Sequence, residues 1–351
     1  QVLAQAFSRG PAGILTSLPN MVKALGVALV AAASFHGAAA FEIVSITPNL
    51  RRSAAAGASG DRFMPQQEPG LFAGSSAPTG LGLAGAVAAA AAVLGATLRR
   101  ASRRPVVGGN WKCNPEKLSD LDGLIENINK CDVSKCDVYV CPSPLHVTYC
   151  VDKVTNGAAV CPQNCNFKGC GAYTGEMSVE QMKDLKIEWC LIGHSERREY
   201  FSESDELLAT KLKYILDAGM KCVFCIGEKL PEREKGLEAT MAVCITQLEQ
   251  VKGMLDPEKV VIAYEPVWAI GTGVTATAEQ AQETHAEIRK WIAANVSEEC
   301  AAGIRIQYGG SANAKNAPEL SACPDIDGFL VGGASLKPEF VEIVAAISAA
   351  K

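Results

Sequence analysis

The sequence lacks an excess of positive charge, since its 33 Lys and Arg residues are outnumbered by 38 Asp and Glu, for a formal net charge of -5. That balance argues against a general nucleic-acid-binding protein. The sequence also lacks the composition of a disordered chain, because 48% of its residues are hydrophobic and only 20% are charged. A length of 351 residues corresponds to about two domains of ordinary size.

Two local absences divide the chain. Residues 1–104 contain no cysteine and only three acidic residues, against nine Lys and Arg. All 14 cysteines lie between Cys113 and Cys323. We therefore expect two chemically different parts, a basic, Ala-rich leader over residues 1–104 and an acidic folded body over residues 105–351.

The leader has the features of a targeting sequence in two parts. Residues 21–40 have the layout of a secretory signal peptide, with Lys23 before a short apolar run and three alanines at 38–40 as a cleavage site. A transmembrane anchor is the alternative, although the run is short for a membrane span. Residues 41–104 are transit-like, because residues 51–80 are rich in Arg, Ser, Ala, Gly and Pro and cannot build a core.

An uncharged stretch over residues 81–98 follows and ends at a group of arginines. This order of segments resembles the bipartite leaders of algae whose plastids have additional membranes. We expect a largely unstructured or helical leader that engages the secretory and plastid import machinery, and a protein located in the plastid. A cytoplasmic, a secreted and a membrane-tethered protein are the alternatives.

The body alternates short apolar segments with helical patterns. Apolar residues recur at helical spacing over 237–254 and 278–296, and another helix begins at Ser204 and ends at Gly219. The short apolar segments predict eight strands, at 106–107, 138–140, 158–161, 189–192, 222–226, 260–264, 305–307 and 328–331.

Strand–helix alternation of this kind predicts a parallel sheet that is buried on both faces. Eight such units in about 250 residues fit a closed (β/α)8 barrel of the α/β class. An open doubly wound sheet is the alternative. That alternative predicts a G-x-G-x-x-G turn after the first strand, and Gly108-Gly109-Asn110-Trp111 does not match this pattern.

Reacting groups in a parallel barrel gather where the strands end and the following loops begin. Polar or glycine residues stand at these positions after the first, fourth, sixth, seventh and eighth predicted strands. They are Asn110 and Lys112, His194, Glu265, Gly309-Gly310-Ser311, and Gly332-Gly333. The sequence therefore predicts one site that is assembled from segments far apart in the chain.

The two glycine turns, at 309–311 and 332–333, predict a phosphate-binding site. Without a Cβ in the way, their N–H groups can approach an anion closely, and the loops after strands seven and eight are the usual phosphate position in such barrels. Two tight turns without a chemical role are the alternative.

Three side chains at the strand ends are suited to carbonyl chemistry. Lys112 would supply a positive charge to a phosphate and to a developing oxyanion, unless it is an ordinary surface lysine. His194, where a helix begins, would stay neutral and donate one hydrogen bond, unless it is structural. Glu265 follows an apolar strand and needs a role or a partner, either as a general base or in a salt bridge across the barrel mouth. The set fits proton transfer beside a carbonyl of a small phosphorylated molecule.

Over almost all of residues 105–351 the body resembles the triosephosphate isomerase family. Several motifs in the right order carry the resemblance: GNWK at 109–112, AYTGE at 172–176, IGHSERR at 192–198, AYEPVWAIGTG at 263–273, YGGS at 308–311 and VGGA at 331–334. The resemblance implies a TIM barrel and an enzyme that interconverts dihydroxyacetone phosphate and D-glyceraldehyde 3-phosphate through an enediolate, without a cofactor or a metal.

The resemblance also implies a role for each catalytic side chain. Glu265 would be the base and His194 the neutral electrophile. Lys112 and Asn110 would bind the substrate and stabilise the enediolate, with Glu196 holding Lys112 in place.

Further residues are implied at the phosphate and at the subunit contact. Backbone N–H groups of Gly271, Ser311 and Gly333 would hold the phosphate, with Gly332 beside them. Residues 266–276 would form a lid, for which this family is a standard example. The family is usually homodimeric, which would place Cys113, Thr174, Glu176 and Arg197 at the interface, with the loop around Thr174 bracing the partner's site.

Two stretches depart from the family pattern. Val274 stands in the lid where many members have lysine, which would change lid kinetics without removing a catalytic group. The third strand region, VCPQNC at 160–165, has more cysteine and proline than expected, and the sequence offers no physical reason.

The cysteines do not suggest a disulfide framework, which belongs to small secreted domains. The two ends of Cys222-x-x-Cys225 should face opposite sides of a strand, and Cys161, Cys165 and Cys170 lack a nearby histidine for zinc. We expect mostly buried thiols in a reducing compartment such as the stroma.

Two other functions compete with the isomerase hypothesis. One is an inactive barrel kept for phosphate binding or protein interaction, and the other is a different phosphosugar reaction. The complete set of catalytic groups argues against the first, and the lid and the His194 segment argue against the second. A plastid location would place the isomerase in the Calvin cycle, and a cytosolic location would place it in glycolysis and gluconeogenesis.

Overall fold

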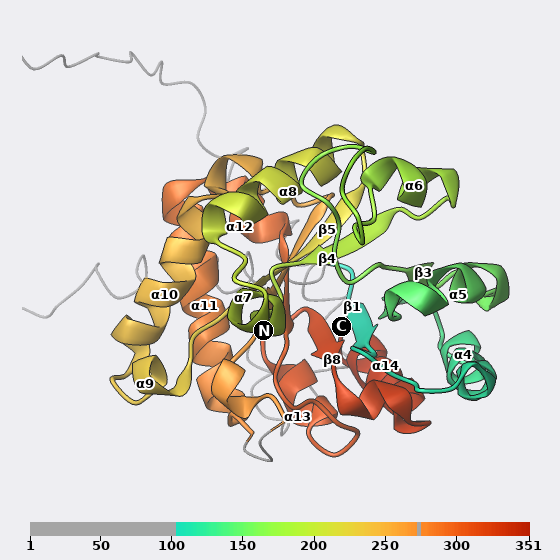
Figure 1. The fold of residues 1–351 in the computed structure, drawn as a ribbon. Coiled ribbons are helices and arrows are strands. Elements are labelled where there is room, and N and C mark those ends of the chain that lie inside the picture. Colours follow the sequence, from blue (N-terminus) through green and yellow to red (C-terminus); the bar gives the residue numbers. More distant parts are fainter. Residues whose placement is uncertain (1–102, 272–274) are drawn as a thin grey trace, which may run out of the picture. The chain divides into compact units, whose positions relative to one another are not determined.

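The computed structural model describes residues 103–271 and 275–351 (Figure 1). The predicted signal peptide over 21–40, nearly all of the transit-like segment over 41–104, and Val274 lie outside the described residues. Within the described ranges, none of the helices combines the length and apolar character that crossing a bilayer requires.

Eight parallel strands form a single sheet in the order β3-β2-β1-β8-β7-β6-β5-β4. The strands are β1 Val106–Asn110, β2 Asp137–Cys141, β3 Ala159–Val160, β4 Trp189–Ile192, β5 Lys221–Ile226, β6 Val260–Tyr264, β7 Arg305–Tyr308 and β8 Gly328–Val331. Every predicted strand is confirmed, and β4, β6 and β8 have the predicted bounds. The open doubly wound sheet is excluded, because the sheet curls round until its two end strands meet.

The place where the barrel closes lies between β3 and β4. Among the described strands this pair alone has no ladder between its members, and β3 is only two residues long. One backbone hydrogen bond crosses the gap, from the N–H of Leu191 to the carbonyl oxygen of Pro162 at 2.9 Å. Pro162 has no N–H to contribute to a ladder. The sequence of this region therefore limits the number of backbone hydrogen bonds that can form between β3 and β4.

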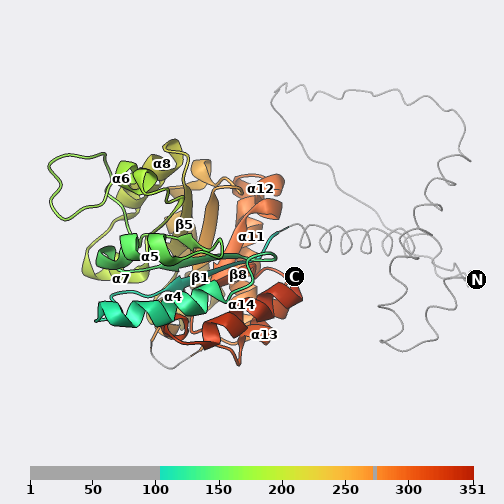
Figure 2. The same cartoon turned by 90° about the vertical axis from the view of Figure 1, so that its right-hand side faces the viewer.

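Helices surround the strands, as Figures 1 and 2 show. The α-helices are α4 Leu121–Asn129, α5 Val147–Lys153, α6 Val179–Asp184, α7 Ser195–Tyr200, α8 Asp205–Asp217, α9 Leu230–Arg233, α10 Leu237–Glu249, α11 Ala278–Asn295, α12 Glu298–Gly303, α13 Ala317–Ala322 and α14 Glu339–Ala350. Short 3-10 helices are η2 Leu118–Asp120, η3 Pro144–His146, η4 Lys252–Met254, η5 Val267–Ala269 and η6 Gly333–Leu336.

The helix predictions hold with one correction. Ser204 caps α8 by accepting a hydrogen bond from the N–H of Leu207, and Gly219 follows the helix in the left-handed region. The continuous helix predicted over 237–254 is wrong at its end, because α10 stops at Glu249 and a separate 3-10 turn follows. Gly253 lies in that turn, and glycine has a low helix propensity.

Two apolar layers stabilise the barrel, one inside the strands and one between the strands and the helices. Inside, the Tyr139 ring stacks on Trp189 with centroids 5.6 Å apart. The Tyr139 hydroxyl donates to Oε1 of Gln307 at 2.7 Å, and Nε2 of Gln307 donates to two backbone carbonyls. The polar atoms of Tyr139 and Gln307 inside the barrel are therefore paired.

The cysteines are all free thiols, and most are buried. Cys222 packs toward the helices and Cys225 into the barrel interior, which confirms that the two face opposite sides of β5. Cys113 and Cys170 are exposed. In the described part of the chain, no three His, Cys, Asp or Glu residues gather in an arrangement that could hold a metal ion.

The two residues before the predicted boundary between leader and body, Arg103 and Arg104, are bonded to the barrel. The Arg103 side chain is 5% exposed, and its Nε lies 2.7 Å from Oδ1 of Asp327. Its two terminal nitrogens donate to the carbonyl oxygens of Ala302 and Pro324. Arg104 pairs with Asp137 at 2.6 Å but is 45% exposed. Both arginines, assigned to the leader from the sequence, are bonded to the barrel.

Arg103→Ala should lower the free energy of unfolding by about 3 kcal/mol, because it leaves the buried Asp327 carboxylate with one partner fewer. Arg104→Ala is the matched control, and we expect less than about 1 kcal/mol from this exposed pair. Urea titration of the barrel measures both changes. Equal losses in the two variants would contradict a structural role specific to Arg103.

Candidate active site

The residues predicted at the strand ends line one cavity of about 370 Å³, called here the front cavity. It lies at the carboxyl ends of the strands, where the sequence places the site. Its lining includes Asn110, Lys112, His194, Glu265, Gly271, Gly309, Gly310, Ser311, Gly332 and Gly333. Segments from residue 110 to residue 333 thus contribute to one space.

Glu265 follows β6 directly and is 2% exposed. Its Oε2 accepts a hydrogen bond from the Ser195 N–H at 3.0 Å, and its Oε1 lies 3.1 Å from Nε2 of His194. The partner of this buried carboxylate is therefore a histidine together with a backbone amide. Gly309 provides the room, because a Cβ there would lie 2.8 Å from Cγ of Glu265.

His194 occupies the residue before α7. Its Nδ1 accepts a hydrogen bond from the N–H of Glu196 at 3.2 Å. A nitrogen that accepts a hydrogen bond carries no proton, so the ring proton lies on Nε2, which faces Glu265. The helix start thus fixes the orientation of the ring, with Nε2 on the side of Glu265 and the front cavity.

Lys112 has a backbone conformation that is unusual for a residue with a side chain, with φ of 53°. Its N–H donates to Oδ1 of Asn110 at 3.0 Å, and its Nζ lies 2.5 Å from Oε1 of Glu196. The predicted contact between Lys112 and Glu196 is present. These bonds hold the ammonium group at the edge of the front cavity.

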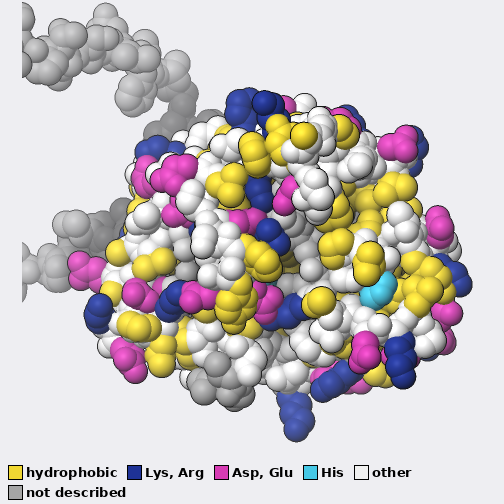
Figure 3. Space-filling view, in the orientation of Figure 1, with side chains coloured by type: hydrophobic (Ala, Val, Ile, Leu, Met, Phe, Trp, Pro, Cys, Tyr) yellow, Lys and Arg dark blue, Asp and Glu magenta, His cyan; other side chains and the backbone are white. Residues whose placement is uncertain are grey.

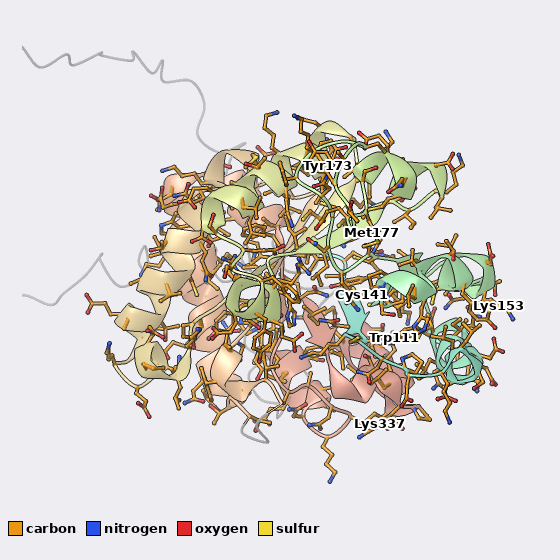
Figure 4. All side chains as sticks on the ribbon, viewed as in Figure 1. Trp111, Cys141, Lys153, Tyr173, Met177 and Lys337 are labelled. Atoms are coloured by element: carbon orange, nitrogen blue, oxygen red, sulfur yellow. The ribbon has the colours of Figure 1, made fainter. Side chains whose placement is uncertain are left out.

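Gln163 is a positioning residue that the sequence reasoning missed. Its Nε2 donates to the carbonyl oxygens of both Lys112 and Cys141 at 2.8 Å. Figure 4 shows Cys141 close to Trp111, whose N–H bonds the same Cys141 carbonyl. Gln163 follows the third strand, so the strand-end rule could have found it. Its side-chain amide braces the unusual Lys112 backbone.

The glycine turns form an open, amide-rich part of the front cavity. A Cβ at Gly271 or Gly333 would meet no atom within 4 Å, so both backbones face free space. Gly333 begins η6, and the first amide groups of a helix have no partner within it. The Ser311 hydroxyl donates to the carbonyl oxygen of Ala269 at 2.7 Å, and Ser311 itself lines the cavity.

The described part of the predicted lid is anchored by a buried carboxylate. Glu228 is fully buried, and its Oε1 accepts hydrogen bonds from Nε1 of Trp268 at 2.8 Å and from the Tyr264 hydroxyl at 3.2 Å. Burial raises the pKa of Glu228. The anchor joins η5 to β6, the strand that carries Glu265.

A second cavity of about 410 Å³, the side cavity, borders the front cavity. It shares Asn110, Lys112 and His194 with the front cavity, and it is also lined by Glu196 and three residues of the predicted interface, Cys113, Glu176 and Arg197. Thr174, the fourth, is exposed in the β3–α6 loop, which extends away from the barrel in Figure 2.

Large apolar side chains are exposed on this face of the barrel. Leu145 is 89% exposed, Tyr200 74% and Phe201 64%. Figure 3 shows hydrophobic side chains in yellow on the face that carries α7 and the β3–α6 loop. Exposed apolar groups that gather around a cavity are typical of a protein–protein contact.

Comparisons with known proteins place the barrel among well-characterised sequences. The family model described as triosephosphate isomerase matches residues 105–347. A triosephosphate isomerase of Coprinopsis cinerea is 50% identical over 242 residues, which cover 68% of this chain and 96% of that protein. One of Taenia solium is 46% identical over 248 residues, covering 69% and 98%. A cytosolic triosephosphate isomerase of Oryza sativa subsp. japonica is 48% identical over 246 residues, covering 69% and 96%.

Proposed function

This chain belongs to the triosephosphate isomerase family, and on that premise we propose which of its residues interconvert dihydroxyacetone phosphate and D-glyceraldehyde 3-phosphate. One observation carries the proposal: the Glu265 carboxylate, the donor nitrogen of His194 and the Lys112 side chain border one cavity whose far side is built from glycine backbone. A base, a neutral donor, a cation and an anion seat are the groups that a proton shift beside a carbonyl requires.

Glu265 is the base that moves the proton. Its carboxylate removes a proton from C1 of dihydroxyacetone phosphate and returns it to C2 of the enediolate, and the aldehyde forms. In the resting geometry both carboxylate oxygens are engaged, by Ser195 and His194. A substrate oxygen that accepts the His194 hydrogen bond frees Oε1 of Glu265 for the proton transfer.

His194 and Lys112 stabilise the charge that forms on the substrate oxygens. Neutral His194 donates a hydrogen bond from Nε2 to the carbonyl oxygen and then to the same oxygen in the enediolate. Lys112 places a positive charge beside the same oxygens and the phosphate, where low exposure strengthens the attraction. Glu196 and Gln163 hold the lysine, and Asn110 fixes its backbone.

The phosphate group binds at the backbone amides of Gly271, Ser311 and Gly333, with Gly332 beside them. A coupled assay on the purified barrel, residues 103–351, with D-glyceraldehyde 3-phosphate as substrate tests the whole assignment. We expect turnover that inorganic phosphate inhibits competitively. An enzyme that turns over its substrate but is not inhibited by inorganic phosphate would contradict a phosphate-binding site at these backbone amides.

The triosephosphate isomerase family is generally homodimeric, and we infer that this chain pairs through the side cavity. The exposed Leu145, Tyr200 and Phe201 side chains support that contact, as does a cavity lined by Cys113, Glu176 and Arg197. Thr174 would reach the partner from the extended loop. A monomer in sedimentation of the active enzyme would contradict this contact.

We also propose that the protein acts in the plastid, on the support of the leader sequence. Processing must then spare Arg103, since its buried side chain is bonded to Asp327. The mature protein is therefore expected to start at or before residue 103. N-terminal sequencing of the protein isolated from its source measures the start. A mature start beyond residue 103 contradicts the required processing position, and an intact signal peptide contradicts import.

A further inference from the structure

Glu265 also borders a second space, whose other lining residues differ from those of the front cavity. This rear cavity has a volume of about 290 Å³ and lies between the loops after β4, β5 and β6 and the helix α10. Its lining includes Gly193, Ser195, Gly227, Val243, Gln247 and Glu265. Neither His194 nor Lys112 is part of that lining, so Glu265 is the one proposed catalytic residue that lines both spaces.

The two carboxylate oxygens of Glu265 have partners that line different cavities. Oε1 lies 3.1 Å from Nε2 of His194, which lines the front cavity. Oε2 accepts the Ser195 N–H at 3.0 Å, and Ser195 lines the rear cavity. The side chain as a whole is 2% exposed. The carboxylate thus lies between one residue that lines the front cavity and one that lines the rear cavity.

The rear cavity has the size and the polar groups that water requires. A water molecule takes about 30 Å³ in the liquid, so the cavity has room for several. Lys229 and Glu199, which form an ion pair, stand at its edge with exposed fractions of 61% and 49%. Glu232 also lines it and is partly exposed. These charged groups connect the space to bulk solvent.

We propose that the rear cavity is the route by which the proton on Glu265 exchanges with solvent while a triose phosphate fills the front cavity. The O–H bond of the protonated carboxyl group breaks as that proton passes to a water molecule, and a proton from the water forms a new O–H bond on the carboxylate. No electron is transferred, and the net charge of the site does not change. The inference rests on the proposed role of Glu265 as the base.

The route has a measurable consequence because each protonated Glu265 has two fates. It returns the proton taken from C1 directly to C2, or it first exchanges that proton with solvent. A substrate in the front cavity covers the carboxylate on that side, so the rear cavity governs the exchange. Narrowing the rear cavity should favour direct transfer, and widening it should favour exchange.

Conversion of dihydroxyacetone phosphate in D₂O separates the two fates. An excess of a dehydrogenase oxidises D-glyceraldehyde 3-phosphate as it forms, which prevents its conversion back to dihydroxyacetone phosphate. NMR of the oxidised product then gives the ratio of deuterium to hydrogen at C2. In Val243→Phe, where an aromatic ring fills rear-cavity space, we expect this ratio to fall by about twofold or more. In Val243→Ala we expect it to rise.

Ala242→Phe is the matched control, because it adds the same ring to an exposed neighbour on α10, and its ratio should equal that of the wild type. The ratio compares two fates of the same bound molecule, so partial loss of folded enzyme does not change it. A ratio that is unchanged in both Val243 variants overturns the route, as does a wild type that incorporates no deuterium. A wild type without turnover overturns the proposed function instead.

Discussion

Glu265→Asp is expected to lower kcat by about 10²- to 10⁴-fold, the contribution of a positioned general base. Aspartate keeps the negative charge and the pairing with buried donors but is one methylene shorter. Its carboxylate therefore stands back from the reacting carbon, and a base must lie within hydrogen-bond reach of the proton that it removes. The loss should fall on kcat, because phosphate binding depends on other residues.

The coupled assay measures kcat and KM, and urea unfolding shows whether the fold is intact. Glu232→Asp is a suitable control, since Glu232 lines the rear cavity but not the front cavity. It receives the same chemical change and should keep the kcat of the wild type. A Glu265→Asp variant that is fully folded and turns over like the wild type would rule out this carboxylate as the base.

Lys112→Met is expected to lower kcat/KM by about 10²- to 10³-fold, the usual effect of removing one charged or hydrogen-bonding stabiliser of a developing oxyanion. Methionine keeps a long apolar stem but removes the ammonium group. The loss arises in both binding and turnover, because the same charge faces the phosphate and the enediolate. Glu196 loses its partner at the same time, which adds repulsion toward an anionic substrate.

The competitive inhibition constant of inorganic phosphate separates the two contributions, since phosphate cannot form an enediolate. We expect weaker phosphate inhibition in Lys112→Met together with a lower kcat. Lys213→Met is the control, because Lys213 pairs with Asp217 on the exposed face of α8. Unchanged kcat/KM in Lys112→Met would show that the lysine is an ordinary surface residue.

The strand pattern was readable from the sequence because each strand of a parallel barrel is buried on both faces. A buried strand is a short apolar run, and its end is marked by the first polar or glycine residue. β6 ends this way at Glu265 and β4 at Gly193, one residue before His194. Since all strands of such a barrel end on one side, the strand ends predicted one site without any knowledge of contacts.

Residues that act through long-range contacts were not readable in the same way. Arg103 resembles the other arginines of the leader, and only its distance of 2.7 Å from Asp327, 224 residues away, shows that it belongs to the barrel. Gln163 follows the third strand, so its position could have been found from the sequence, but its function could not. Its role depends on a contact with Lys112, which no periodicity encodes.

The sequence by itself determined the fold class, the edge of the barrel where the site lies and the chemical types that meet there. These follow from local alternation of apolar and polar residues, which a single pass along the chain reveals. Only the tertiary structure decided how Glu265 is shared between two cavities, which ring nitrogen of His194 carries its proton and what supports the unusual backbone of Lys112. Those properties depend on atoms brought together by closure of the barrel, so their energies come from neighbours distant in the chain.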